Sequence, residues 1–90
     1  MKRTEIFIAV EAERAYQNDK WGSKFDNLNS PNDWTAYIVQ YLGRSVTFPW
    51  NRDTFRAMIL KVMALCCAVL EQEEYHPRHY DRQDGKDKLS

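Results

Sequence analysis

The chain has 90 residues, 43% of them hydrophobic, and its 13 basic and 13 acidic residues give a formal net charge of zero. One domain is the natural unit at this length, and a lone monomer would be only marginally stable. The balanced charge excludes a broad basic field for duplex DNA or anionic lipid, so we expect neither duplex nucleic acid nor a membrane as a partner.

The first predicted helix covers residues 4–19, with Thr4 as its cap. Only five apolar residues, 6–10, follow the basic start, which is too short a run for a signal peptide, so we expect the mature protein to be the whole chain. Residues 20–29 are predicted to form a loop, because Gly22 can take a positive φ and the Asn and Asp residues favour turns.

The second predicted helix covers residues 30–43. Its start is the strongest local signal in the chain, a variant of the capping box with Ser30 as N-cap, Pro31 at the first helical position and Asp33 three residues after the cap. An amphipathic stripe rich in aromatic residues follows, and Gly43 is placed to end the helix.

An apolar run from 58 to 70 dominates the rest of the chain. After a predicted loop over 44–50, it forms the middle of a third helix over 52–75, which Asn51 or Asp53 can cap. This helix is apolar on nearly every side, and two shorter helices cannot cover it. We therefore predict an all-α, three-helix chain whose long apolar C-terminal helix forms the core of a homo-oligomer. A monomer with a folded aromatic loop is the alternative.

The division that we expect is a helical domain over 1–76 and a charged, mobile tail over 77–90. Pro77 ends the third helix, and the tail has few apolar residues. The two cysteines, Cys66 and Cys67, are adjacent and cannot join distant segments, which indicates a reducing cytoplasm and a core role.

Basic and aromatic residues gather near the end of the first helix: Arg14, Lys20, Trp21, Lys24 and Phe25. An aromatic plane stacks a base while Arg or Lys holds phosphate, so this mixture favours a nucleotide over a sugar or a peptide. We predict that Trp21 and Phe25 stack the base and that the three basic side chains hold its phosphate. His79 or Tyr80 from a neighbouring subunit would cover the ligand.

The aromatic residues also have a plainer interpretation, in which Trp21, Trp34, Phe48 and Trp50 plug the ends of a helical core. We predict no catalytic residue, no metal ligand and no cofactor. A Mg²⁺ site would need more carboxylates in one place than the first helix supplies, and no Cys or His stands at zinc-ligand spacing.

The segment after Val10 carries an E-R-x-x-Q-x-x-K-W-G pattern in Glu13, Arg14, Gln17, Lys20, Trp21 and Gly22. It resembles the opening of many small proteins of bacteriophages and prophages, some of them similar to MazG-type nucleotide pyrophosphohydrolases. The resemblance implies an all-α oligomer in the cytoplasm of a bacterial host. Those pyrophosphohydrolases hold Mg²⁺ with an E-x-x-E set on one helix and an E-x-x-D set on the next, and the resemblance is to MazG-like phage proteins that lack these metal-binding acids. Lys61, in contrast, is the only charge in the run 58–70 of this chain.

In size, inferred oligomerisation and basic-aromatic loops, the chain is also similar to small phage "sponges" that sequester cyclic nucleotide or cyclic ADP-ribose signals of bacterial defence. We therefore predict non-catalytic binding of a nucleotide-type small molecule by a phage protein that sequesters such a signal. Two alternatives stay open. One is a MazG-like, Mg²⁺-dependent nucleoside triphosphate pyrophosphohydrolase that uses Glu11, Glu13 and acids from another subunit. The other is an interaction module that docks a host protein.

Overall fold

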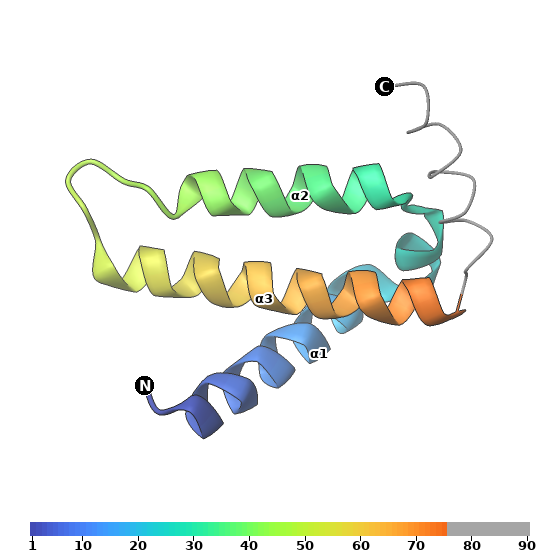
Figure 1. Ribbon diagram of the computed structural model, residues 1–90, viewed down its shortest axis with the longest axis horizontal. Helices are drawn as coiled ribbons and strands as arrows, with labels where there is room; N and C mark the ends of the chain where they lie inside the picture. Colours follow the sequence, from blue (N-terminus) through green and yellow to red (C-terminus); the bar gives the residue numbers. More distant parts are fainter. Residues whose placement is uncertain (76–90) are drawn as a thin grey trace.

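A computed structural model describes the backbone of residues 1–75, and the side chains in that range except those of Trp21, 23–28 and Tyr75. Over these residues the protein contains three helices and no strand, which confirms the all-helical class: α1 (Arg3–Leu28), α2 (Pro31–Arg44) and α3 (Arg52–Tyr75). α1 and α2 each pack against α3, which lies between them (Figure 1). None of the described helices is long and apolar enough to cross a membrane. The predicted tail, 77–90, lies outside the described residues.

α1 differs from its prediction at both ends. Thr4 lies inside the helix instead of capping it, and the Glu5 side chain accepts a hydrogen bond from the backbone N–H of Lys2 at 3.3 Å. The loop predicted over 20–29 is wrong, because the helix continues to Leu28 with only Gly22 in a non-helical conformation (φ 76°, ψ 167°). Glycine adopts a positive φ at little steric cost, so one residue redirects the helix without a loop.

α2 begins with the capping box that the sequence predicts. The Ser30 hydroxyl accepts a hydrogen bond from the Asp33 backbone N–H at 3.2 Å, and the Asp33 carboxylate accepts one from the Ser30 N–H at 2.9 Å. The helix ends one residue later than expected, at Arg44. Its C-cap is Ser45, whose hydroxyl donates to the Leu42 carbonyl oxygen at 2.6 Å, and Gly43 is an ordinary helical residue.

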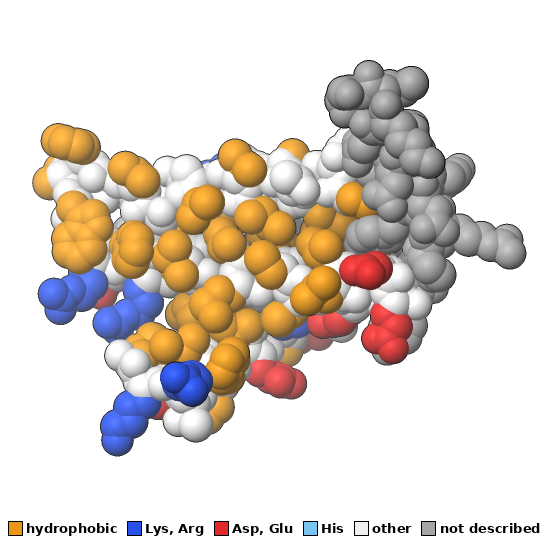
Figure 2. All heavy atoms as spheres, in the orientation of Figure 1, with side chains coloured by type: hydrophobic (Ala, Val, Ile, Leu, Met, Phe, Trp, Pro, Cys, Tyr) orange, Lys and Arg blue, Asp and Glu red, His pale blue; other side chains and the backbone are white. Residues whose placement is uncertain are grey.

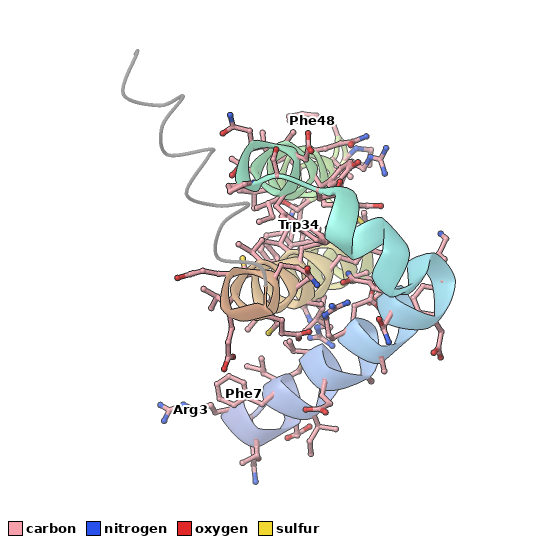
Figure 3. The ribbon with its side chains drawn as sticks, turned by 90° about the vertical axis from the view of Figure 1, so that its right-hand side faces the viewer. Arg3, Phe7, Trp34 and Phe48 are labelled. Carbon is pink, nitrogen blue, oxygen red and sulfur yellow. The ribbon has the colours of Figure 1, made fainter. Side chains whose placement is uncertain are left out.

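The side of α3 that faces α2 forms the apolar core. Trp34 of α2 is fully buried against Leu65 and Ala68 of α3, and its label in Figure 3 lies between these two helices. Half-buried side chains on both helices close the cluster, namely Tyr37, Ile38, Tyr41 and Val69. The plainer interpretation is therefore correct for Trp34, which is a core residue.

α3 has the predicted bounds, and the Asn51 side chain caps it by accepting a hydrogen bond from the Thr54 N–H at 2.9 Å. A further side of the helix carries four apolar residues spaced by four, three and four positions, which we call the outer stripe: Ile59, Met63, Cys66 and Leu70. Leu70 is 65% exposed and Cys66 is also exposed, while the other two are half-buried. The described parts of α1 and α2 leave Cys66 and Leu70 open, whereas Ile6 of α1 lines a groove together with Ile59 and Met63. Figure 2 shows an apolar band running along α3 on the face turned to the viewer.

Candidate functional site

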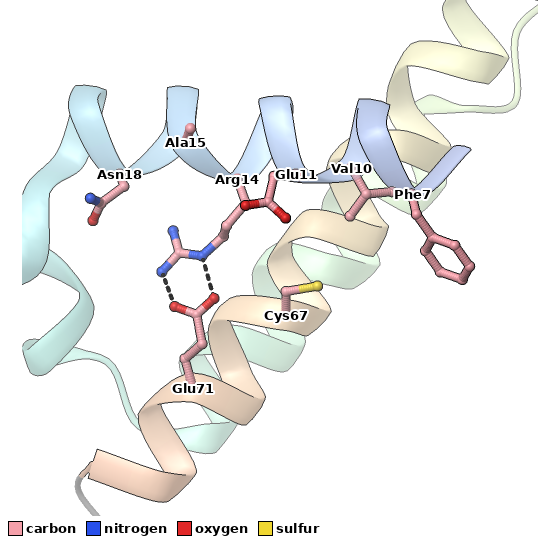
Figure 4. A pocket seen from close by; sticks show the side chains of 8 residues that line it. All are labelled: Phe7, Val10, Glu11, Arg14, Ala15, Asn18, Cys67 and Glu71. Carbon is pink, nitrogen blue, oxygen red and sulfur yellow. Dashed lines mark hydrogen bonds and ion pairs between the residues drawn. The ribbon is translucent and has the colours of Figure 1, made fainter. Parts of the chain in front are cut away.

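A pocket of about 410 Å³ lies where α1 crosses α3 (Figure 4). Six of its lining residues come from α1 and two from α3: Phe7, Val10, Glu11, Arg14, Ala15, Asn18, Cys67 and Glu71. The α1 residues recur at spacings of three and four, which places them on one side of that helix. The pocket therefore combines an apolar wall with several polar groups that can form hydrogen bonds.

Arg14 is fixed in the pocket by Glu71. Its Nε and one terminal nitrogen donate to the two carboxylate oxygens of Glu71 at 3.2 and 3.1 Å, a bidentate ion pair between α1 and α3. The charge of Arg14 is thereby balanced, and the Glu11 carboxylate adds a further negative charge to the lining. The pocket is thus better suited to a ligand edge rich in N–H groups than to a bare phosphate.

The rim of the pocket is apolar. Phe7 is 60% exposed, and in Figure 4 its ring lies at the end of the pocket opposite Asn18. Cys67 lies on the α3 side. Its neighbour Cys66 is exposed as a residue, yet partial burial raises the pKa of its thiol, and the adjacent Cys67 raises it further.

The contact between α1 and α3 includes a second set of polar groups around Lys61. Its ammonium forms an ion pair with Glu13 at 2.8 Å and lies 5.6 Å from the centre of the Tyr16 ring. The Gln17 side chain, only 2% exposed, donates to the backbone carbonyl of Lys61 at 3.4 Å, while its own Oε1 has no hydrogen-bond partner. A charged residue within an apolar run needs a partner of opposite charge. The sequence therefore predicts that Lys61 has such a partner, but it does not identify Glu13 as that residue.

The predicted ligand site is only partly described. Arg14 lies in the pocket, and Lys20 is exposed on α1, about 120° from Arg14 around the helix axis at the usual helical twist. The side chains of Trp21, Lys24 and Phe25 lie outside the described part of the structure, and so do His79 and Tyr80. The structure instead joins Arg14 to three residues that the sequence did not single out for binding, namely Phe7, Asn18 and Glu71.

The described acids do not form a metal centre. No group of three or more His, Cys, Asp or Glu side chains that could hold a metal ion occurs in the part of the chain that the structure describes. Glu71 and Glu74 stand at E-x-x-E spacing at the end of α3, but Glu71 is paired with Arg14. Glu13, an acid that the pyrophosphohydrolase alternative requires, is paired with Lys61.

A groove of about 320 Å³ lies beside the outer stripe. Ile6 of α1 and Trp50 of the loop before α3 line it together with Phe55, Ile59 and Met63. Trp50 remains 60% exposed while its ring lies 6.1 Å from that of Phe55. The proposed plugging role is therefore wrong for Phe48, which is fully exposed, and incomplete for Trp50.

No protein-family model, curated protein or solved structure matches this chain.

Proposed function

We propose that this protein is a non-catalytic binding protein that acts as a homo-oligomer and takes a nucleotide-type small molecule as its ligand. The observation that carries the proposal is the pocket between α1 and α3, whose volume of about 410 Å³ lies within the size range of small-molecule sites. The pocket offers an exposed aromatic ring, two carboxylates and an amide within a largely apolar wall.

The base is the part of a nucleotide that suits this pocket. Base amino and imino groups donate hydrogen bonds, and the carboxylate of Glu11, one turn from Phe7 on α1, can accept them. Phe7 supplies a face on which a base can stack. The Arg14–Glu71 ion pair leaves no uncompensated positive charge at the inner wall for a phosphate. We therefore assign phosphate to the basic residues predicted from the sequence, Lys20 and Lys24.

Self-association is supported by the open side of α3. The outer stripe is apolar, and the described residues leave it accessible in a helix that is otherwise packed on both flanks. An apolar surface of this kind is typical of a protein–protein contact, and a second copy is always present as a partner.

Sequestration is the role that we propose for such a binder. The resemblance of residues 13–22 to phage proteins supports it, and so does the general likeness in size and inferred oligomerisation to nucleotide-signal sponges. Glu13, one of the two acids that the hydrolase alternative names, is engaged by Lys61 on the neighbouring helix. This engagement supports binding without conversion, in which a cyclic nucleotide or cyclic ADP-ribose signal is held and later released intact.

A thermal-shift screen against linear and cyclic nucleotides and cyclic ADP-ribose isomers, with and without Mg²⁺, tests the proposal. A ligand at about 100 times its Kd should stabilise the protein by about 2.7 kcal/mol, which raises the unfolding midpoint measurably. The ligand recovered after heat denaturation should be chemically unchanged. If no compound shifts the midpoint, the nucleotide proposal is rejected and a host protein becomes the better candidate partner.

Two matched variants locate the site. Phe7→Ala should remove most of the ligand-induced shift, whereas Ile8→Ala, a neighbour that is also exposed and does not line the pocket, should retain it. Retention of the shift in both variants would place the ligand elsewhere. A triphosphate consumed only with Mg²⁺, and no longer consumed by Glu13→Gln, would favour the pyrophosphohydrolase alternative instead.

A further inference from the structure

The outer stripe of α3 ends in opposite charges. Arg56 precedes Ile59 by three residues, and Glu73 follows Leu70 by three, so both charged residues continue the stripe on the same side of the helix. Both side chains are exposed, and within the described residues neither forms an ion pair. Figure 2 shows basic side chains gathered towards the start of α3 and acidic side chains towards its end, with the apolar band between them.

The positions follow a seven-residue repeat. From Arg56 through the four stripe residues to Glu73, the spacing alternates between three and four without interruption. This alternation is typical of helices that pair along their length. The helix side is thus arranged for contact with another helix, rather than with a flat surface or a small molecule.

We propose that two copies of the chain pair α3 against α3 in antiparallel orientation through the outer stripe. In this register Ile59 faces Leu70 of the second copy, Met63 faces Cys66, and Arg56 faces Glu73. Each pair occurs twice, as a two-fold axis requires. The midpoint of all three pairs falls between residues 64 and 65, so the apolar contacts and the charges select the same register.

Charge decides the orientation. A parallel pair would bring Arg56 onto Arg56 and Glu73 onto Glu73, and like charges in direct contact oppose association. The antiparallel pair places each Arg56 on a Glu73, about 13 Å from the two-fold axis at the usual helical rise. Leu70, whose side chain is 65% exposed in the single chain, then lies over Ile59 at the groove that Trp50 and Phe55 also line.

This inference rests on the homo-oligomer of the proposed function and adds its interface and symmetry. The test is sedimentation velocity of the full chain and three variants over a concentration series. Arg56→Glu and Glu73→Arg should each weaken self-association about tenfold or more, because each places like charges at both ends of the interface. The double variant Arg56→Glu, Glu73→Arg should restore it.

Two controls make the result specific. Arg44→Glu makes the same charge change on α2, where the guanidinium packs on Tyr41 of its own chain, and should leave association unchanged. Leu70→Ala should weaken association while the monomer keeps its unfolding midpoint, because Leu70 makes little contact within one chain. This result would support the apolar part of the interface.

The failures can be told apart. A wild-type chain that stays monomeric at every concentration overturns both the homo-oligomer and this interface, and a partner protein or residues 76–90 would then be the occupant of the stripe. A wild-type chain that self-associates but is insensitive to Arg56→Glu and Glu73→Arg overturns only the antiparallel α3 contact. Failure of the double variant to restore association when both single variants weaken it also overturns that contact.

Discussion

The two flanks of α3 are built from different chemistry. On the α2 side, Trp34 closes over Leu65 and Ala68 in an apolar contact with almost no accessible surface. On the α1 side, two ion pairs and a buried amide contribute to the contact, and Val10 is the only buried hydrophobic side chain that α1 contributes among the described residues. The same helix is therefore held by apolar packing on one flank and by a mixture of apolar and polar contacts on the other.

This difference between the two flanks indicates which helix pair contributes more to stability and which is better placed for ligand binding. Burial of a large apolar side chain contributes about 1.5–3 kcal/mol, whereas a partly exposed ion pair contributes about 1 kcal/mol or less. We infer that the α2–α3 pair supplies most of the stability and that α1 is the element able to open locally. The candidate ligand pocket lies on the α1 flank, where polar groups are present and rearrangement costs least.

The largest effect should come from breaking the apolar flank. Trp34→Ala removes the largest fully buried side chain and should lower the free energy of unfolding by about 3–5 kcal/mol, measured by urea denaturation. Leu42→Ala, on the exposed side of the same helix, should cost less than about 1 kcal/mol. Equal losses for the two variants would contradict the assignment of the core to this flank.

The three helices could be predicted because their signals are local. The capping box at Ser30 and the cap at Asn51 involve residues three positions apart, and the structure contains both. Gly22 shows the limit of such signals. A glycine indicates that the chain can take a positive φ at that position. Whether a loop or a further helical segment follows depends on what the next residues pack against, and the local sequence does not contain that information.

The candidate site could be predicted less well, because it depends on contacts between residues that are far apart in the sequence. Arg14 was singled out as a phosphate ligand from its neighbours in sequence, yet its partner Glu71 is 57 positions away. Glu13 and Lys61 are separated by 48 positions. Sequence can show that a lone charge in an apolar run needs a partner, but the identity of that partner follows only from how α1 crosses α3.

A smaller effect should follow from making the polar flank more apolar. The Oε1 atom of Gln17 is buried without a hydrogen-bond partner, and its amide N–H contact to the Lys61 carbonyl is long, at 3.4 Å. Gln17→Met keeps the length of the side chain and removes the unsatisfied oxygen, so the free energy of unfolding should stay level or rise by about 1 kcal/mol. A loss of more than about 1 kcal/mol in urea denaturation would mean that the amide has a partner after all.

The smallest effect concerns the ion pair in the pocket. A double-mutant cycle with Arg14→Gln and Glu71→Gln should give a coupling free energy of about 0.2–1 kcal/mol, because the Glu71 side chain is 46% exposed and water competes for it. The bidentate geometry favours the upper part of this range.

Added salt should reduce the coupling between Arg14 and Glu71, since screening acts on exposed charges. The matched cycle on Glu13 and Lys61, whose side chains are 21% and 29% exposed, should lose less of its coupling to salt. A coupling above about 2 kcal/mol for Arg14 and Glu71 would show that the polar flank holds α1 as firmly as the apolar flank holds α2, and local opening of α1 would no longer be expected.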